Sequence, residues 1–193
     1  MTTPDIFVLG ADAQAAGGYF QVADLDATAP TDATSPLVGF TSAGIISLDG
    51  VTVAETKSTT PVKDASGAIV RVILTEYGVR VSLSLLAPTL ATFEYMYGVG
   101  NVTQDANGNI TRRFRKAEAP VKSWALHFVD EGRKVRLYLP AGQIVETGDK
   151  VYNVENPTNY EVVIECRPNA DGDYALEFTQ GGETVVYTPG EDE

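Results

Sequence analysis

Cysteine and histidine are almost absent from this chain of 193 residues. Cys166 is the single cysteine, so an intramolecular disulfide cannot form and nothing indicates an oxidising compartment. His127 is the single histidine, so a catalytic triad would have to use it. Because it stands beside Phe128 in an apolar stretch, we expect it to be structural. The single cysteine therefore excludes a secreted disulfide scaffold.

Motifs for cofactor and substrate chemistry are also missing. The sequence contains no Walker-type loop, no GxGxxG loop and no Cys/His cluster with zinc spacing. The acid pairs Asp130-Glu131 and Asp171/Asp173 have the residue types of a calcium site or of glycosidase carboxylates. Acids at turns are far more often plain solvated residues. We therefore expect no enzyme activity, no cofactor and no metal.

Basic residues are few, and long apolar runs do not occur. The chain has 14 basic and 26 acidic residues, and its net charge of −12 has the wrong sign for a protein that grips phosphates. No apolar run approaches the ~18 residues of a membrane helix. The first residues, MTTPDIFVLG, carry no basic segment, so we expect no signal peptide.

What the sequence does contain is enough apolar material for one folded domain. Hydrophobic residues make up 44% of the chain. At this length a single domain buries roughly 70% of the surface that its unfolded chain exposes. We therefore expect residues 1–193 to form one domain without disulfide support.

Alternation of apolar and polar residues predicts β-strands through much of the chain. The pattern is strongest in residues 68–86, where a break at Tyr77-Gly78 indicates either two tightly joined strands or one long strand bent at the glycine. Residues 124–128 and 135–139 alternate on either side of a short polar loop, which predicts a hairpin that Pro140 ends. Further strands are expected at residues 160–166 before Pro168, at 174–178, and more weakly at 6–9 and 19–22. The fold class is therefore mainly β: an antiparallel β-sandwich or partial barrel with long extended loops.

One segment has a helical period instead. Leu90, Phe93 and Tyr97 are spaced i, i+3 and i+7, Thr89 can cap the first turn, and Gly98 stands where a helix ends. We expect a short α-helix that packs on the sheet. Residues 95–97 could be a ligand-stacking box, but an aromatic stripe at helical spacing is usually core.

Three stretches show no regular period. Residues 23–35 predict an extended surface connection, and residues 56–67, within a longer segment 49–67, predict a long exposed loop between strands. The ends, residues 1–22 and 181–193, have strand-like pieces beside glycine-rich hinges and are expected to be arms that pair with a neighbouring copy.

Charge is segregated along the chain. Residues 1–70 carry 8 acids and 2 bases, residues 71–140 carry 6 acids and 10 bases, and residues 141–193 carry 12 acids and 2 bases. Such separation either keeps the protein soluble or makes copies attract head to tail.

Six sequence blocks together resemble a known family. In order, they are PTDATSPLVGF (30–40), LDGVTVAE (48–55), VRVILTEYGVRVSLSLL (70–86), the short helix ending at Tyr97-Gly98, LYLPAGQIVETGDKVY (137–152) and YEVVIECRP (160–168). This succession is similar to the major tail protein, or tail tube protein, of long-tailed bacteriophages that infect actinobacteria.

The resemblance implies a structural virion protein assembled in the host cytoplasm. Such proteins form hexameric rings that stack into a hollow tube, around a tape-measure protein and in contact with tail-tip and terminator proteins. DNA later passes through the lumen without specific binding. We expect the hairpin 124–139 and the strand 79–86 to form the inner sheet, where edge strands of neighbouring subunits would join.

The resemblance also suggests which residues carry assembly. Residues 49–67 could project as a hairpin of about ten residues per arm and reach a neighbouring ring. The residues expected to stack one ring on the next are Thr56, Lys57, Ser58, Thr59, Thr60, Pro61, Val62, Lys63 and Asp64. Bases expected to face neighbouring subunits or the exterior are Arg112, Arg113, Arg115 and Lys116, and their expected acidic partners are Glu146, Asp149 and Glu155. A less favoured interpretation is that the basic cluster binds nucleic acid directly.

Two other functional classes stay open. A binding or decoration module would use Tyr95, Tyr97, Tyr138 and Tyr152 as an aromatic surface. A glycan-cleaving enzyme would need two acids in one cleft.

Overall fold

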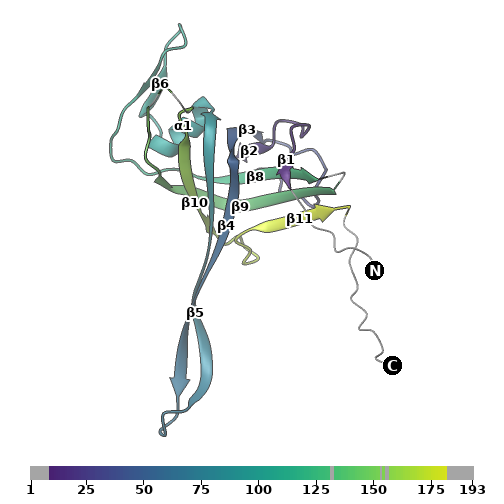
Figure 1. The fold of residues 1–193 in the computed structure, drawn as a ribbon, viewed down its shortest axis with the longest axis vertical. Helices are drawn as coiled ribbons and strands as arrows, with labels where there is room; N and C mark the ends of the chain where they lie inside the picture. The colour runs from purple at the N-terminus through teal and green to yellow at the C-terminus, as the bar shows by residue number, and fades with distance from the viewer. Residues whose placement is uncertain (1–8, 131–132, 153, 155–156, 182–193) are drawn as a thin grey trace.

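The fold is one large antiparallel sheet that bends over its own core (Figure 1). The computed structural model describes residues 9–130, 133–152, 154 and 157–181. The strands and the single helix of this part are β1 (Gly10–Ala11), β2 (Phe20–Ala23), β3 (Thr41–Ser42), β4 (Gly44–Lys63), β5 (Ile69–Pro88), α1 (Leu90–Tyr97), β6 (Val102–Gln104), β7 (Ile110–Arg112), β8 (Val121–Asp130), β9 (Arg133–Thr147), β10 (Tyr160–Arg167) and β11 (Leu176–Gln180).

Nine of these strands share one sheet with the order β3-β2-β8-β9-β10-β5-β4, to which β1 adds on β8 and β11 on β9. β6 and β7 form a separate pair. In Figure 1, β4, β5 and β10 follow the long axis of the molecule, whereas β8, β9 and β11 run across it. The predicted mainly β class, with antiparallel strands and one short helix, is confirmed, and the sheet does not close into a barrel.

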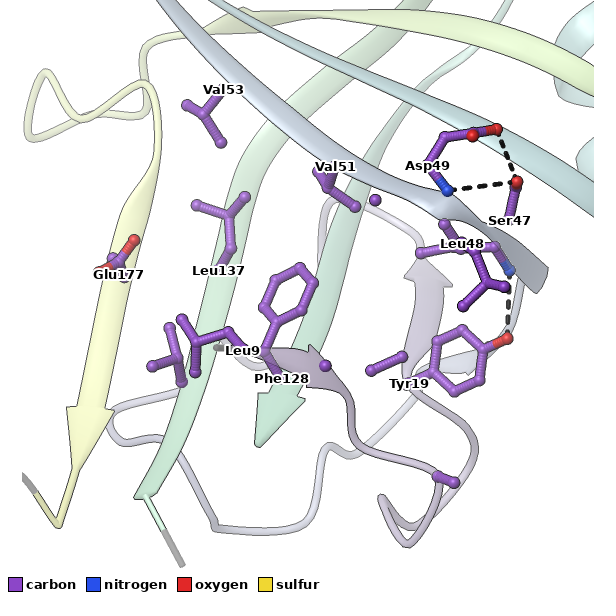
Figure 2. A pocket seen from close by; sticks show the side chains of 16 residues that line it. Leu9, Tyr19, Ser47, Leu48, Asp49, Val51, Val53, Phe128, Leu137 and Glu177 are labelled. Carbon is purple, nitrogen blue, oxygen red and sulfur yellow. Dashed lines mark hydrogen bonds between the residues drawn. The ribbon is translucent and has the colours of Figure 1, made fainter. Parts of the chain in front are cut away.

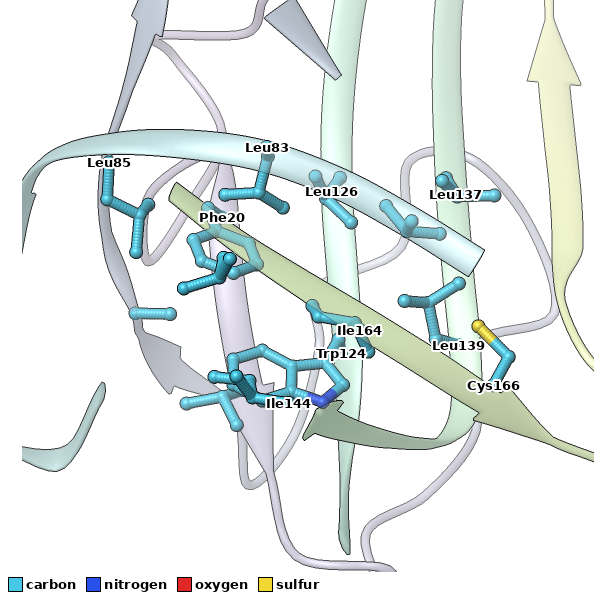
Figure 3. Close-up of a cluster of buried hydrophobic side chains, with 14 of the residues drawn as sticks. Phe20, Leu83, Leu85, Trp124, Leu126, Leu137, Leu139, Ile144, Ile164 and Cys166 are labelled. Carbon is cyan, nitrogen blue, oxygen red and sulfur yellow. The ribbon is translucent and has the colours of Figure 1, made fainter. Parts of the chain in front are cut away.

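The core lies where these two directions cross (Figure 3). Trp124 of β8 is fully buried and its ring stacks on Phe20 of β2, with the ring centroids 5.5 Å apart. Leu85 of β5 and Ile164 of β10 are also fully buried in this cluster. The alternation of apolar and polar residues in the sequence therefore corresponds to one buried face on each of these strands.

A close approach explains one glycine in this core. A Cβ on Gly142 of β9 would lie 2.6 Å from Cγ2 of Ile164 and 2.7 Å from Cδ1 of Trp124. The indole Nε1 of Trp124 also donates to the Gly142 carbonyl over 3.0 Å. The indole ring can lie flat against β9 only because residue 142 has no side chain.

The predicted helix is confirmed together with its caps. Thr89 accepts a hydrogen bond from the Thr92 backbone NH through its side chain, and Gly98 follows the last turn with a φ of 89°. The Thr92 hydroxyl donates to the buried Ala43 carbonyl over 2.6 Å, which ties α1 to the sheet. Tyr95 meets Trp124 edge to face. The aromatic residues of α1 therefore include core contacts, as the helical spacing indicated.

Pro140 does not end its strand, and this prediction was wrong. β9 continues to Thr147 because Pro140 lies where the ladder does not need its missing NH. On one side the register against β8 shifts between Lys122 and Trp124. On the other side of β9, β11 pairs with residues 134–138, and the pairing with β10 starts only at residue 141 of β9. A proline at such a junction of a bulge and two partner strands is compatible with a continuous strand.

The prediction of a loop at residues 56–67 was also wrong, because most of these residues are strand, whereas the alternative of a projecting hairpin agrees with the structure. β4 runs without interruption to Lys63, and only residues 64–68 form a turn before β5. β5 is likewise one strand through Tyr77 and Gly78, which excludes the alternative of two joined strands. Pro61 is tolerated because β4 is the last strand of the sheet and needs partners on one side only.

Other predicted segments agree with the structure. The hairpin of β8 and β9 is confirmed, β10 ends at Arg167 before Pro168, and residues 24–40 contain no strand. Residues 20–23 form β2 in the protein's own sheet, so Phe20 and Val22 are core residues. The strand expected at 6–9 lies mostly, and the arm 182–193 entirely, outside the described residues. Among the residues that are described, no helix has the length and apolar character to cross a membrane.

Candidate functional site

The most prominent surface is the outer half of the β4–β5 hairpin, which projects beyond the rest of the protein (Figure 1). We call residues 59–74 the blade: 59–63 of β4, the turn 64–68 and 69–74 of β5. The two strands stay paired along it, from Thr59 opposite Leu74 to Lys63 opposite Ile69. Of the stacking residues expected from the sequence, residues 59–64 therefore lie in the blade, and Thr56, Lys57 and Ser58 precede it in β4.

The base of the hairpin is anchored on the body. Tyr77 contacts Tyr174 edge to face with ring centroids 5.0 Å apart. Arg80 donates through Nε to Glu165 over 2.6 Å and through Nη1 to Glu146 over 3.4 Å. These contacts join β5 to β9, β10 and the segment before β11, so the blade extends from a fixed base.

The turn at the tip is organised by one aspartate. Asp64 accepts hydrogen bonds from the Ser66 hydroxyl over 2.6 Å and from the Ser66 and Ala68 backbone NH groups. These bonds, that of the Ser66 hydroxyl foremost, lower the pKa of the Asp64 carboxyl. Gly67 supplies a φ of 87° that closes the turn. The tip is therefore a defined turn, and Asp64 stays ionised at neutral pH.

The blade leaves its apolar side chains in solvent. The exposed fractions are 60% for Ile69, 62% for Val70, 57% for Val72, 41% for Ile73, 55% for Leu74 and 39% for Val62. On the inner half of the same strand, Val79, Val81, Leu83 and Leu85 are at most 5% exposed. β5 thus changes from core strand to exposed apolar strand along its length.

Both faces of the blade are apolar. Val72 lies opposite Pro61 and Leu74 opposite Thr59 on one face, while Ile73 lies on the other face of β5. Antiparallel sheets that meet water usually keep one face polar, and an isolated two-stranded hairpin is only marginally stable in water. A strand pair of this composition needs a covering surface, and the residues that the structure describes do not provide one.

A groove on the body is the second apolar surface (Figure 2). Its volume is about 760 Å³, and its walls come from β1, β4, β8, β9 and β11. We call it the β4 groove, because residues 46–51 and 53 of β4 line it. Ile46 pairs with Leu85 and Val51 with Leu83, so residues 47–50 bulge out and leave Leu48 fully exposed.

Sequence reasoning missed this groove. The available signal was Leu48-Asp49-Gly50, a turn-like tripeptide inside an otherwise strand-forming segment, because an isolated glycine in a strand often marks a bulge. Gly50 has a φ of 79°, as such a bulge requires. The remaining walls come from strands far apart in the sequence, which no local pattern brings together.

The predicted basic cluster lies around β7 and the segment after it. Arg113, Arg115 and Lys116 are exposed. Arg112 is half-buried, and its guanidinium carbon lies 4.0 Å from the centre of the Phe93 ring and 5.8 Å from that of Tyr160. In the described part of the chain none of these four bases forms an ion pair.

Within the described residues, the predicted acidic partners form no ion pair with these bases. Glu146 pairs with Arg80 of its own chain. Asp149 is exposed, and Glu155 lies outside the described residues. Pairing of this basic cluster with a neighbouring copy stays a prediction, and of the three acids Glu146 already has a partner.

The alternative aromatic surface does not form as expected. Tyr138 is buried and contacts Phe40. Tyr95 packs against Trp124 in the core, whereas Tyr152 is mostly exposed. The four tyrosines therefore do not share one accessible face, because strand and helix periodicity turn some of them inward.

The titratable groups considered for catalysis are placed as structural residues. His127 is buried, and its Nδ1 accepts a hydrogen bond from Nε of Arg136 over 3.4 Å. Burial, with the nearby Arg136 charge, lowers the pKa of His127 to about 4. Burial raises the pKa of the Cys166 thiol to about 12. Both groups are neutral at pH 7.

One of the two acid pairs lies in a turn. The Asp171 and Asp173 backbone NH groups both donate to the Asn169 side chain, so these acids belong to a tight turn. Of the pair Asp130-Glu131, Glu131 lies outside the described residues. Over the described ranges, no three His, Cys, Asp or Glu side chains gather as metal ligands would.

Comparison with known proteins identifies the family. The chain matches the phage tail tube protein family over residues 11–178. Among solved structures it is similar to the anti-feeding prophage cap, a tube-terminating cap determined by cryo-EM, with 10% sequence identity and a TM-score of 0.47 over 93% of this chain and 99% of that one. A search of curated proteins gives no match. Because the family match covers most of the chain, including the β4–β5 hairpin, the protein belongs to the phage tail tube protein family and is a structural component of the virion tail.

Proposed function

We propose that this protein polymerises as stacked hexameric rings into the tail tube, through which DNA leaves the virion, and that the blade joins one ring to the next. The role is structural and not enzymatic. The observation that supports the proposal is the blade, an anchored hairpin with two exposed apolar faces. A surface of this kind on a single chain is explained by burial against another copy.

The other partners follow from the tail tube role. The tube would form in the host cytoplasm around a tape-measure protein and end at tail-tip and terminator proteins. The hairpin 124–139, which belongs to β8 and β9, and residues 79–86 of β5 would form the inner wall. These strands belong to one sheet, in which β10 lies between β9 and β5. The predicted arm 1–22 is wrong in part, because residues 10–11 and 20–22 lie in β1 and β2 of the chain's own sheet. The ends that would strengthen contacts between subunits are therefore residues 1–9 and 181–193.

Microscopy and sizing of the purified full chain test this proposal. Negative-stain images at increasing protein concentration should show six-fold rings and tubes, and light scattering should show mass that grows with concentration. A monodisperse monomer at every concentration would contradict polymerisation and favour a binding module.

A matched pair of variants tests the part played by the blade. Val70→Thr with Val72→Thr makes two exposed blade valines polar without changing their shape. Val38→Thr with Val99→Thr does the same at two exposed valines elsewhere, which are 72% and 69% exposed. We expect the first variant to lose tubes and the second to keep them, with the same far-UV circular dichroism in both. Equal assembly of the two variants would mean that the blade is not a contact surface.

A further inference from the structure

We propose that the β4 groove of one copy receives the blade of a second copy, an inference that rests on the proposed polymerisation and names the acceptor surface for it. The two surfaces are the donor and acceptor halves of one head-to-tail contact. Three observations carry this assignment: matching apolar character, opposite charge, and a strand geometry that prevents a chain from filling its own groove.

The apolar match concerns the groove floor. Val53, Phe128 and Leu137 contribute apolar side chains to it, and the exposed Leu48 stands at one margin (Figure 2). The Tyr19 hydroxyl accepts a hydrogen bond from the Ile46 backbone NH over 3.1 Å, which holds one end of the bulge in place. The groove is therefore a preformed apolar surface, and valine, isoleucine and leucine side chains of a strand pair are its natural occupants.

The charge match concerns the margins. Asp49 and Glu177 line the groove from β4 and β11, on opposite sides of it (Figure 2). The blade carries Lys63 and Arg71 beside its apolar residues and one acid, Asp64, which the turn at its tip holds in hydrogen bonds. The two groove acids and the two blade bases form no ion pair within the described residues. Seating a basic blade in an acid-rimmed groove would pair charges that each copy leaves unpaired and would set the orientation of docking.

The strand geometry excludes the chain's own blade as the occupant, so the blade that we propose in the groove comes from a second copy. The groove is lined by residues 46–53 of β4, and the blade begins at residue 59 of the same strand. The blade lies in line with the inner half of the hairpin and points away from the body (Figure 1). It cannot fold back onto the groove without breaking the β4–β5 ladder. Because donor and acceptor are different surfaces, each added copy presents a new free blade and a new free groove, which is the requirement for a growing polymer.

A charge-swap experiment on the full chain tests the pairing. One variant reverses the blade charges, Lys63→Glu with Arg71→Glu. A second reverses the groove margins, Asp49→Lys with Glu177→Lys. The fourfold variant carries all these changes, and Asp26→Lys with Glu118→Lys is the control at exposed acids outside both surfaces. The readout is the critical concentration for tube formation, measured by sedimentation, with circular dichroism as the check on folding.

We expect each double reversal to raise the critical concentration about tenfold or more, since like charges would then face each other. The fourfold variant should return to within about threefold of the starting protein, and the control should polymerise normally. Failure of the fourfold variant to recover, with folded protein and normal tubes from the unchanged chain, would overturn this assignment and leave the proposed function intact. Absence of tubes from the unchanged chain would instead overturn the proposed function.

Discussion

Removing the blade should separate assembly from folding. The shortest replacement deletes residues 59–75 and joins Ser58 to Glu76 through Asn-Gly, because these two residues are directly opposite in the ladder and Asn-Gly favours the required turn. The deletion removes no buried side chain, since every residue from 59 to 75 is exposed. We therefore expect the unfolding free energy of the monomer to change by no more than about 1 kcal/mol.

The effect on assembly should be large. Six apolar side chains of the blade are about 40–60% exposed, and complete burial of such a side chain contributes about 1.5–3 kcal/mol. Burying the exposed half of each gives about 1 kcal/mol per side chain, or about 6 kcal/mol per blade. Ordering of these side chains on association subtracts about a third of that free energy. The remaining ~4 kcal/mol corresponds to a rise of roughly a thousandfold in critical concentration.

Sedimentation measures that critical concentration, and urea denaturation measures the monomer. Tubes that form at the original concentration from the shortened chain would refute the reasoning, because the apolar surface would then contribute nothing to contacts. A shortened chain that unfolds at much lower urea would also refute it, since the blade would then belong to the protein's own stable core.

The remaining predictions concern pH, the chain end, DNA and the cysteine. The pKa of His127 is about 4 in the folded chain against an ordinary 6.5, so between these pH values the unfolded chain binds a proton that the folded chain does not. The free energy of unfolding should therefore fall by up to about 3 kcal/mol as pH drops from 6.5 to 4. The variant His127→Gln should flatten that part of a plot of urea midpoint against pH. Truncation before Gly181 should raise the critical concentration for tubes and leave the monomer's melting temperature unchanged; a large loss of melting temperature would place the tail in its own core. Assembled tubes should not shift duplex DNA in a low-salt gel, whereas tight, salt-sensitive binding would show that the exposed bases grip phosphates. The Cys166 thiol, with its pKa raised to about 12, should resist maleimide in folded protein and react after denaturation.

The strands of the core were predictable because each has one buried and one solvated or differently packed face. Val79, Val81, Leu83 and Leu85 alternate with polar residues for this reason, and all four are buried. The helix was predictable from its capping residues, because Thr89 and Gly98 satisfy local backbone requirements that do not depend on the rest of the fold.

The blade and the β4 groove were less predictable, because local sequence rules do not describe them. Residues 56–63 mix threonine, serine, lysine and proline, a composition that local rules assign to a loop, and yet they pair along β5. The β4 groove could not be predicted for a different reason, because strands that are far apart in the sequence form its walls. β9 continues past Pro140 because β8 bulges opposite it and because neither β11 nor β10 pairs with residues 139–140. Local sequence does not show these pairings.

The continuity of β4 and β5 has a mechanical consequence. Each is a single strand of 20 residues that passes from the blade to the centre of the body without an intervening loop. Tension applied to a seated blade would therefore be shared by two backbones in parallel. In the body it would load the hydrogen bonds between β5 and β10 in shear, many at once, instead of opening them one after another. A tube built from such subunits would stretch little before it ruptured, and it would rupture between copies rather than by unravelling a subunit.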